Sequence, residues 1–134
     1  MRSLAQKVAL VFGVVFILVA VVGFITPGGM GMAADMESAP HALGLFPVNL
    51  LHNVVHLLFG IWGVAASRTH PAAVTYCRVA GVIYLVLMVL GFVAPDGFGL
   101  VPLGGNDIWL HALLGIVLAG VGFTAKPEAV AVTP

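Results

Sequence analysis

The stretch VALVFGVVFILVAVVGFI, residues 8–25, contains neither a charged residue nor a proline. A helix of about 20 apolar residues crosses the ~30 Å hydrocarbon core of a bilayer, because each residue adds ~1.5 Å. Thr26-Pro27-Gly28-Gly29 follows directly, and proline followed by glycine ends a helix. The stretch therefore predicts a first transmembrane helix.

The same stretch predicts a retained helix rather than a cleaved signal peptide. Arg2 and Lys7 precede it, and Ala33-Ala34 resembles the small residues of a cleavage site. The apolar core of a signal peptide is only about 7–15 residues long, however, and the run at residues 8–25 is longer.

Three further apolar blocks, at about residues 49–66, 76–94 and 106–123, have similar lengths and end near proline or charged residues. Of the 134 residues, 61% are hydrophobic and 7% are charged, and the mean hydropathy is +1.16. In lipid, a helix satisfies its own backbone hydrogen bonds. The sequence thus predicts one all-α domain over residues 1–134, an integral membrane four-helix bundle whose first partner is the lipid bilayer.

The charged residues divide between the two sides of this predicted bundle. The basic side chains are Arg2, Lys7, Arg68, Arg78 and Lys126, and the acidic side chains of the other side are Asp35, Glu37, Asp96 and Asp107. Lys and Arg favour the cytoplasmic side of a membrane, so both chain ends and the tail at 124–134 are predicted to be cytoplasmic, and the loop at 26–48 external. A net charge of zero leaves no cationic surface for a nucleic-acid partner.

The four blocks form an internal repeat. A shift of 55 residues aligns the second block with the fourth, and a shift of 68 aligns the first with the third. The aligned pairs include Pro47/Pro102, His56/His111, Gly60/Gly115, Gly13/Gly81, Gly23/Gly91 and Pro27/Pro95. A two-helix unit returns the chain to the side where it entered, so the pattern predicts a tandem, parallel duplication about an axis along the membrane normal.

Four ionisable residues fall in the second and fourth blocks. His52 and His56 are four residues apart and share one helix face. The 55-residue shift places Asp107 and His111 at the same two positions. Ionisable groups inside a membrane span usually face the protein interior and mark a functional site. We therefore expect these four side chains to converge in the outer half of the bundle.

The residues leave the role of this cluster open. In the plainest interpretation, the histidines hydrogen-bond across helices and the carboxylate caps the fourth helix. In a second interpretation, His52, His56, Asp107 and His111 bind a transition metal such as zinc, for which three imidazoles and a carboxylate are a suitable ligand set.

Two other interpretations use part of the cluster. His56 and His111 could be axial ligands to a haem or another tetrapyrrole, with Gly60 and Gly115 leaving room for the flat ring. A proton relay or transport role is a further alternative, which a single carboxylate supports only weakly.

The loop at 26–48 contains Met30, Met32, Met36 and His41 among glycines and alanines. Thioether and imidazole groups suit Cu(I), but their spacing matches no strict motif. The simpler interpretation is a mobile loop with incidental methionines.

Four segments together resemble a known family: LFPVNLLHNVVHLLFG (45–60), SRTHPAA (67–73), YCRVAGVIYLVLMVLG (76–91) and GLVPLGGNDIWLHALLG (99–115). They resemble the bacterial membrane family catalogued as domain of unknown function 4383. The resemblance implies a four-span protein of the bacterial inner membrane, multi-pass, and it implies no particular activity.

No nucleophile motif, phosphate-binding loop or cysteine metal motif occurs, so we predict that the protein is not an enzyme. The leading prediction is a structural or accessory subunit that associates with a larger membrane complex or as a homo-oligomer. Glycine-lined faces at Gly60/Gly63 or Gly120 would allow close helix contacts. The alternative is a haem-, tetrapyrrole- or metal-binding bundle, and a transporter or channel is a third class.

Overall fold

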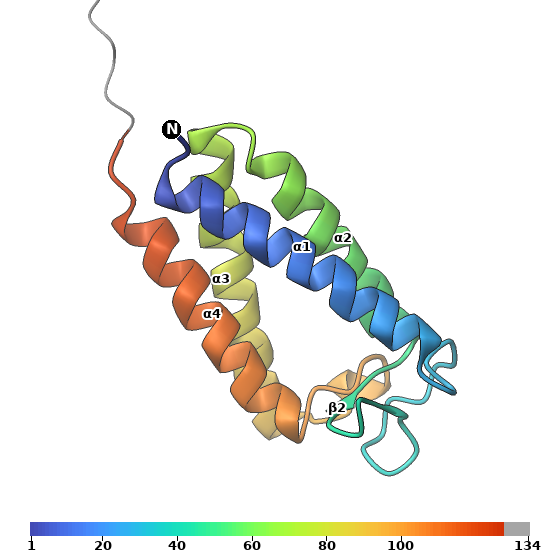
Figure 1. The fold of residues 1–134 in the computed structure, drawn as a ribbon. Coiled ribbons are helices and arrows are strands. Elements are labelled where there is room, and N and C mark those ends of the chain that lie inside the picture. Colours follow the sequence, from blue (N-terminus) through green and yellow to red (C-terminus); the bar gives the residue numbers. More distant parts are fainter. Residues whose placement is uncertain (128–134) are drawn as a thin grey trace, which may run out of the picture.

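The computed structural model describes residues 1–127, and the remainder of the predicted tail lies outside the described residues. The chain folds as an all-helical bundle with one very short β-hairpin, which confirms the predicted fold class (Figure 1). Its elements in chain order are α1 (Leu4–Ile25), β1 (His41–Ala42), β2 (Phe46–Pro47), α2 (Leu50–Ala66), α3 (His70–Val93), the 3-10 turn η1 (Gly97–Gly99) and α4 (Asn106–Thr124).

The helices have the dimensions and composition of a membrane bundle. Among the described residues, α1, α3 and α4 are each long and apolar enough to cross a membrane. Helix α2 is apolar as well, but with 17 residues it is shorter than the others. At ~1.5 Å per residue it still extends over roughly 25 Å.

Two helices begin earlier than their apolar blocks predict. Helix α1 begins at Leu4 because Ser3 and Gln6 form a capping box, in which Ser3 Oγ accepts the Gln6 backbone N–H at 3.3 Å and Gln6 Oε1 accepts the Ser3 N–H at 3.0 Å. Helix α3 begins at His70, not near Tyr76, because Pro71 occupies its first turn. Proline needs no hydrogen-bond acceptor there and has a suitable φ angle.

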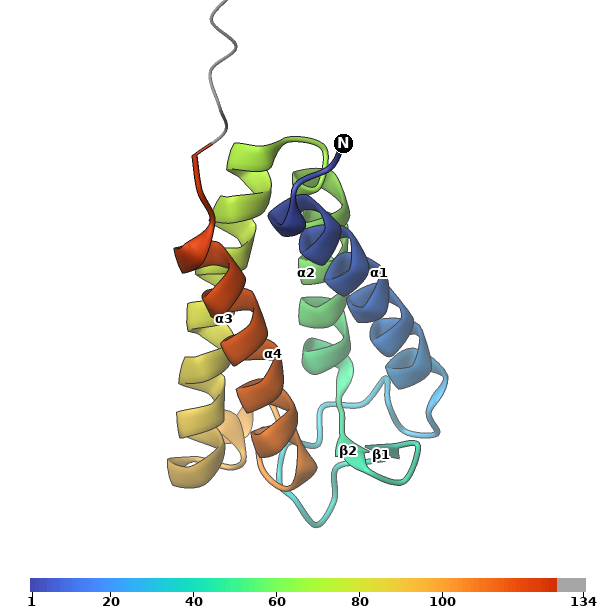
Figure 2. The ribbon, with the colours of Figure 1, turned by 60° about the vertical axis from the view of Figure 1, so that its left-hand side comes forward.

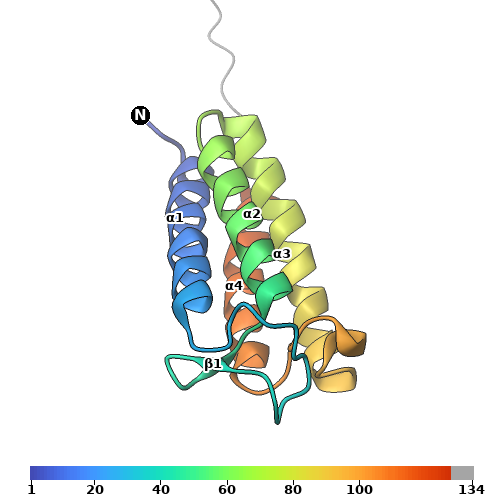
Figure 3. The ribbon, with the colours of Figure 1, turned by 90° about the vertical axis from the view of Figure 1, so that its right-hand side faces the viewer.

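The helices form two antiparallel pairs, α1 with α2 and α3 with α4 (Figure 2). The N-terminus, the link at residues 67–69 and Pro127 lie at one end of the bundle, which we call the basic end because Arg2, Arg68 and Lys126 are there. The connections at 26–49 and 94–105 lie at the opposite, loop end (Figure 3). The two pairs are closest at the basic end, and α1 and α4 diverge toward the loop end (Figure 1).

The two pairs use equivalent contacts, as the internal repeat predicts. A Cβ at Gly13 of α1 would lie 2.6 Å from the backbone nitrogen of Val64 in α2. A Cβ at Gly81 of α3 would overlap the backbone nitrogen of Ala119 in α4. Gly81 follows Gly13 by 68 residues and Ala119 follows Val64 by 55, the two shifts of the repeat. The same glycine-dependent helix contact is therefore formed twice, which supports the predicted duplication.

Small and aromatic side chains fill the core between the pairs. Near the basic end, buried alanines let α1 approach α3, and Cys77 is buried among them. Further along, the rings of Phe16 on α1 and Tyr84 on α3 stack with centroids 5.2 Å apart and planes at 11°. These two residues correspond under the 68-residue shift. The aromatic pair therefore lies where the two halves of the bundle meet.

The loop at 26–48 is ordered against α4 rather than free of it. Strands β1 and β2 pair antiparallel, with His41 opposite Pro47. The Asn106 amide donates a hydrogen bond to the Leu45 carbonyl at 3.0 Å, and the Phe46 ring packs 5.7 Å from that of Trp109. The hairpin thus covers the loop end of the bundle.

A buried histidine cluster as the candidate metal site

Helix α2 places two imidazoles inside the bundle. The side chain of Asn49 caps the helix by accepting the His52 backbone N–H at 2.9 Å, which fixes the first turn. His52 and His56 follow on one face, and each is only 4% exposed. The spacing of four residues brings their ring centroids to 4.5 Å.

Helix α4 presents the equivalent pair from the opposite side. Asp107 lies in its first turn and His111 one turn further, and each is 1% exposed. The helix begins after Gly105, whose φ of 63° lies in the region that favours glycine. This turn directs the chain from the loop end back into the bundle, so both side chains face α2.

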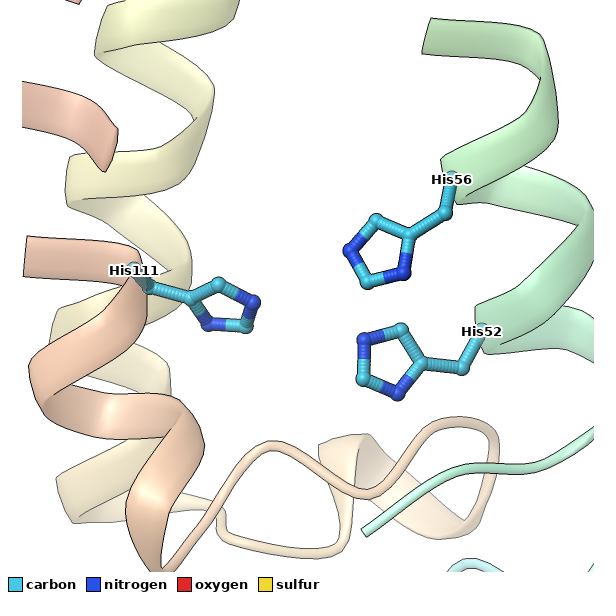
Figure 4. Close-up of side chains that lie close together, drawn as sticks. All are labelled: His52, His56 and His111. Carbon is cyan, nitrogen blue, oxygen red and sulfur yellow. The ribbon is translucent and has the colours of Figure 1, made fainter. Parts of the chain in front are cut away.

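The predicted cluster is therefore brought together. One ring nitrogen from each of His52, His56 and His111 lies within 4.8 Å of the others (Figure 4). The Asp107 carboxylate is not part of this group but lies beside it, with its Oδ2 3.6 Å from His52 Nε2. All four side chains that the sequence singled out converge in the half of the bundle near the loop end.

Five polar atoms of this cluster have no hydrogen-bond partner within residues 1–127. The buried atoms without a partner are His52 Nε2, His56 Nδ1, Asp107 Oδ2, His111 Nδ1 and His111 Nε2. An unsatisfied buried donor or acceptor costs about 1–3 kcal/mol. No hydrogen bond joins these groups to one another within the described residues, and a bound cation would satisfy several of these atoms at once.

The hydrogen bond of His52 fixes which of its nitrogens can bind a ligand. His52 Nδ1 lies 3.0 Å from the Pro47 carbonyl oxygen, which can only accept, so Nδ1 carries a hydrogen. In the neutral ring, Nε2 then has a lone pair, and it faces the Asp107 carboxylate. Two acceptors do not attract each other, so a proton or a metal cation must lie between them. A ligating histidine commonly donates its other N–H to a backbone carbonyl in this way.

The aromatic pair Phe16 and Tyr84 borders the cluster on the side of the basic end. The His56 ring stacks on Phe16 at 5.7 Å and 6°, and it is parallel to Tyr84 at 6.5 Å and 10°. The His111 ring lies 5.4 Å from Tyr84. These contacts restrict both imidazoles. The sequence analysis missed Phe16, although the 68-residue shift aligns it with Tyr84 and could have identified the pair.

Two apolar pockets reach the cluster from opposite sides. One, of about 260 Å³, lies between α1, α4 and the hairpin and ends at His52, His56 and Asp107. The other, of about 220 Å³, lies between α2, α3 and the loop before α4, and it ends at His52, His56 and His111. The polar groups are thus enclosed by apolar walls.

Two asparagines near the cluster have structural roles. The Asn49 amide donates to the Leu100 carbonyl at 2.8 Å, and the Asn53 amide donates to the Gly29 carbonyl at 2.9 Å. Each side chain ties a helix to a connection at the loop end. These hydrogen bonds hold the loop-end connections over the histidines. The asparagine side chains are used in these bonds, so they are not among the proposed ligands.

The glycines that were expected to leave room for a tetrapyrrole serve helix packing instead. A Cβ at Gly60 would lie 2.8 Å from the backbone nitrogen of Ile17, and a Cβ at Gly115 would lie 2.9 Å from that of Leu85. Backbone from α1 and α3 therefore fills this space. Axial ligation of a haem by His56 and His111 stays a prediction, without the support of these glycines.

The methionines of the loop at 26–48 take different environments. Met36 packs against Gly104 and Gly105, which directly precede α4. A Cβ at either glycine would lie close to the Met36 side chain. Met30 and Met32 are 61% and 52% exposed. Binding of Cu(I) by this loop stays a prediction.

Comparison with known proteins identifies the family but no characterised relative. No curated protein and no solved structure matches the chain. A family model described as "Domain of unknown function (DUF4383)" matches residues 6–124, which include the whole histidine cluster and all four helices except the first two residues of α1. The chain therefore belongs to the DUF4383 family.

Proposed function

We propose that this protein is an integral membrane protein that binds a transition-metal ion inside its bundle. The ligands are His52, His56 and His111, with Asp107 as the fourth. The observation that carries the proposal is the convergence of three buried imidazoles whose ligand atoms lie within 4.8 Å of one another. Burial of these groups without partners has a cost that metal binding offsets.

The ligand chemistry favours zinc or a similar divalent ion. Three imidazoles and one carboxylate suit Zn²⁺, with bonds of about 2.0–2.2 Å. Tetrahedral coordination would place the nitrogens roughly 3.3 Å apart, and in the structure the three ligand atoms lie within 4.8 Å of one another. Rotation of the imidazole rings about their side-chain bonds can supply this closure. We propose binding rather than catalysis as the function.

The proposed placement has four crossings, with the basic end in the cytoplasm of a bacterial cell and the loop end outside its inner membrane. Helix α2 runs beside α1, so it would extend over most of the same layer (Figure 2). Arg2, Arg68 and Lys126 gather at one end, in agreement with the positive-inside rule. The metal would then lie in the half of the membrane nearer the outside.

Metal analysis of the purified protein tests the proposal. The wild-type protein should bind about one equivalent of Zn²⁺ or Co²⁺, and tetrahedral Co²⁺ should give visible absorption bands. Replacing His56 or His111 with Leu should remove this binding. His41→Ala, in the β1 strand, is the matched control and should bind normally. Absence of metal binding in the folded wild-type protein, or a haem spectrum after purification, would reject the proposal.

An accessory role in a larger membrane complex or a homo-oligomer is the second candidate. Among the predicted contact glycines, Gly60 and Gly63 face α1 and Tyr76 inside the bundle, so they cannot receive a partner. Gly120 is exposed on α4, and a Cβ there would meet nothing within 4 Å. A partner helix could approach at this position. Gly120→Leu should then shift the size of the complex in mild detergent, and an unchanged monomer for both proteins would exclude self-association.

A further inference from the structure

An arginine lies on the surface of the bundle about two turns into α3. Arg78 is exposed, although it belongs to a helix of membrane-spanning length. Its Nε donates to the Gly122 carbonyl at 2.8 Å, and its guanidinium carbon lies 5.5 Å from the centre of the Phe123 ring. One of the five guanidinium donors is used in this bond, so the others stay available for an anionic acceptor.

Helix packing does not require an arginine at this position. The 68-residue shift aligns Arg78 on α3 with Leu10 on α1. Leucine is sufficient in the first half of the duplicated bundle. In the second half, one Arg78 donor satisfies the Gly122 carbonyl in the last turn of α4. A charged side chain in a membrane span is costly, so its remaining donors also need an acceptor.

Arg78 borders a pocket at the basic end, between the start of α3 and the end of α4. The pocket has a volume of about 480 Å³, and its polar lining residues are His70, Thr75, Arg78 and Lys126. No acidic residue lines it within the described part of the chain. The His70 ring is fixed there, with Nδ1 2.8 Å from Ser3 Oγ and Nε2 2.9 Å from the Lys126 carbonyl oxygen. The pocket thus suits an anion.

An apolar groove lies further along α3, beyond Arg78. It is lined by Val82, Leu85, Val86, Val89 and Leu90. Val82, Leu85, Val86 and Val89 follow Arg78 by 4, 7, 8 and 11 residues, so they form one stripe with it on the helix. From Arg78 to Leu90 the stripe extends roughly 18 Å along the helix. A free phosphate ion would use the cationic pocket but not the groove.

We infer that Arg78, with Lys126, binds the phosphate of an anionic phospholipid, one of whose acyl chains lies along the groove at residues 82–90. Basic pockets between helices at a membrane surface bind lipid head groups in this manner. The inference is independent of the proposed metal site, which lies in the opposite half of the bundle. The lipid would brace α3 against α4 at the basic end.

Lipid binding by the purified full-length protein tests the inference. Native mass spectrometry and thermal unfolding would compare dioleoylphosphatidylglycerol with dioleoylphosphatidylcholine. The wild-type protein should prefer phosphatidylglycerol at least fivefold, since each basic residue near a membrane surface contributes about that factor. Arg78→Leu should lose most of this preference, and leucine should fold because Leu10 occupies the equivalent place. Arg78→Lys should retain it.

Matched controls separate the possible sources of the effect. Arg68→Leu removes a charge at the same end but outside the pocket, and it should leave the preference unchanged. Lys126→Gln lies beyond α4, so it tests the site without disturbing a helix, and it should reduce the preference. Equal affinity for the two lipids, an unchanged preference in Arg78→Leu and Lys126→Gln, or competition by millimolar inorganic phosphate would overturn the inference.

Discussion

Individual contacts in the cluster show how ionisable side chains are held in the interior of the bundle. His52 is oriented by the Pro47 carbonyl, and its second nitrogen faces Asp107 across 3.6 Å. His111 has no partner for either nitrogen within residues 1–127. The fold therefore fixes the position of each residue and leaves it a nitrogen that can bind a ligand. This combination is typical of a preformed binding site.

Removal of His111 separates a metal site from a hydrogen-bonded core. In a metal chelator, we expect His111→Leu to be as stable as the wild type or more stable by about 1–3 kcal/mol, because an unsatisfied polar side chain is replaced by an apolar one. With saturating Zn²⁺ the order should reverse, since only the wild type gains binding energy. Thermal unfolding in detergent measures both. Loss of stability in the chelator would instead support the hydrogen-bonded core.

Removal of the carboxylate charge tests the fourth ligand. Asp107→Asn keeps the shape of the side chain but weakens its interaction with a cation, so the affinity for Zn²⁺ should fall about 10–100-fold. Three histidines remain, and binding should not disappear. A competition titration with a chromophoric chelator gives the affinity. Asp96→Asn, in the loop before η1, is the control and should match the wild type.

At the scale of helices, the glycine contacts of the repeat decide how closely each pair can pack. Gly13 and Gly81 occupy equivalent positions, and a Cβ at either would meet the backbone of the paired helix. We expect Gly13→Ala and Gly81→Ala each to destabilise the protein by about 1–3 kcal/mol through overpacking. Gly120→Ala, which meets open space, should be neutral. Equal stability of all three variants, measured by thermal unfolding, would contradict the packing shown here.

Sequence periodicity and composition were sufficient to predict the helices and the convergence of the cluster. Apolar runs located all four helices to within a few residues, apart from the early start of α3 at Pro71. The repeat placed His111 opposite His56, because the two halves pack in the same way. A duplicated sequence therefore predicts a contact between residues 55 positions apart.

Other features depend on three-dimensional contacts that a single sequence does not reveal. The hairpin of β1 and β2 has only two residues in each strand, too few for a pattern of alternation. Gly60 and Gly115 could have faced either a ligand or a neighbouring helix, and only the packing of α1 and α3 decides between these. Phe16 has the same apolar character as its neighbours, so its position beside His56 was not evident.

The loop at 26–48 also contains a local hydrogen bond that its length does not predict. The backbone N–H of Ser38 donates to Asp35 Oδ1 at 2.8 Å, and this hydrogen bond lowers the pKa of the Asp35 carboxyl below its ordinary value. A turn of this kind stabilises the loop. The cover over the cluster is thus built from several short-range interactions.

For the molecule as a whole, the separation of charges predicts its orientation. Reporters fused after Lys126 or within residues 67–69 should be cytoplasmic, and reporters near Asp35 or Asp96 should be external, because Lys and Arg favour the cytoplasmic side of a membrane. Paired phosphatase and fluorescent-protein fusions measure this. A cytoplasmic signal at both Asp35 and Lys126 would mean that the three helices between them, α2, α3 and α4, do not all cross the membrane.

The duplication explains why a metal site would form between the two halves of the bundle. Each half contributes one helix with two inward polar side chains, and His52 and His56 of α2 point toward His111 of α4 (Figure 4). The basic end, in contrast, is closed by small residues and aromatic rings. A bound ion would join the two halves where direct packing between them is least.

The most direct measurement is anomalous diffraction at the zinc absorption edge, from crystals of the full-length protein grown with Zn²⁺. We predict one strong peak inside the bundle, about 2.0–2.1 Å from a nitrogen of each of His52, His56 and His111. The peak should be absent in His56→Leu crystals grown in the same way. Well-ordered wild-type crystals with no peak among these histidines would contradict the proposed metal site.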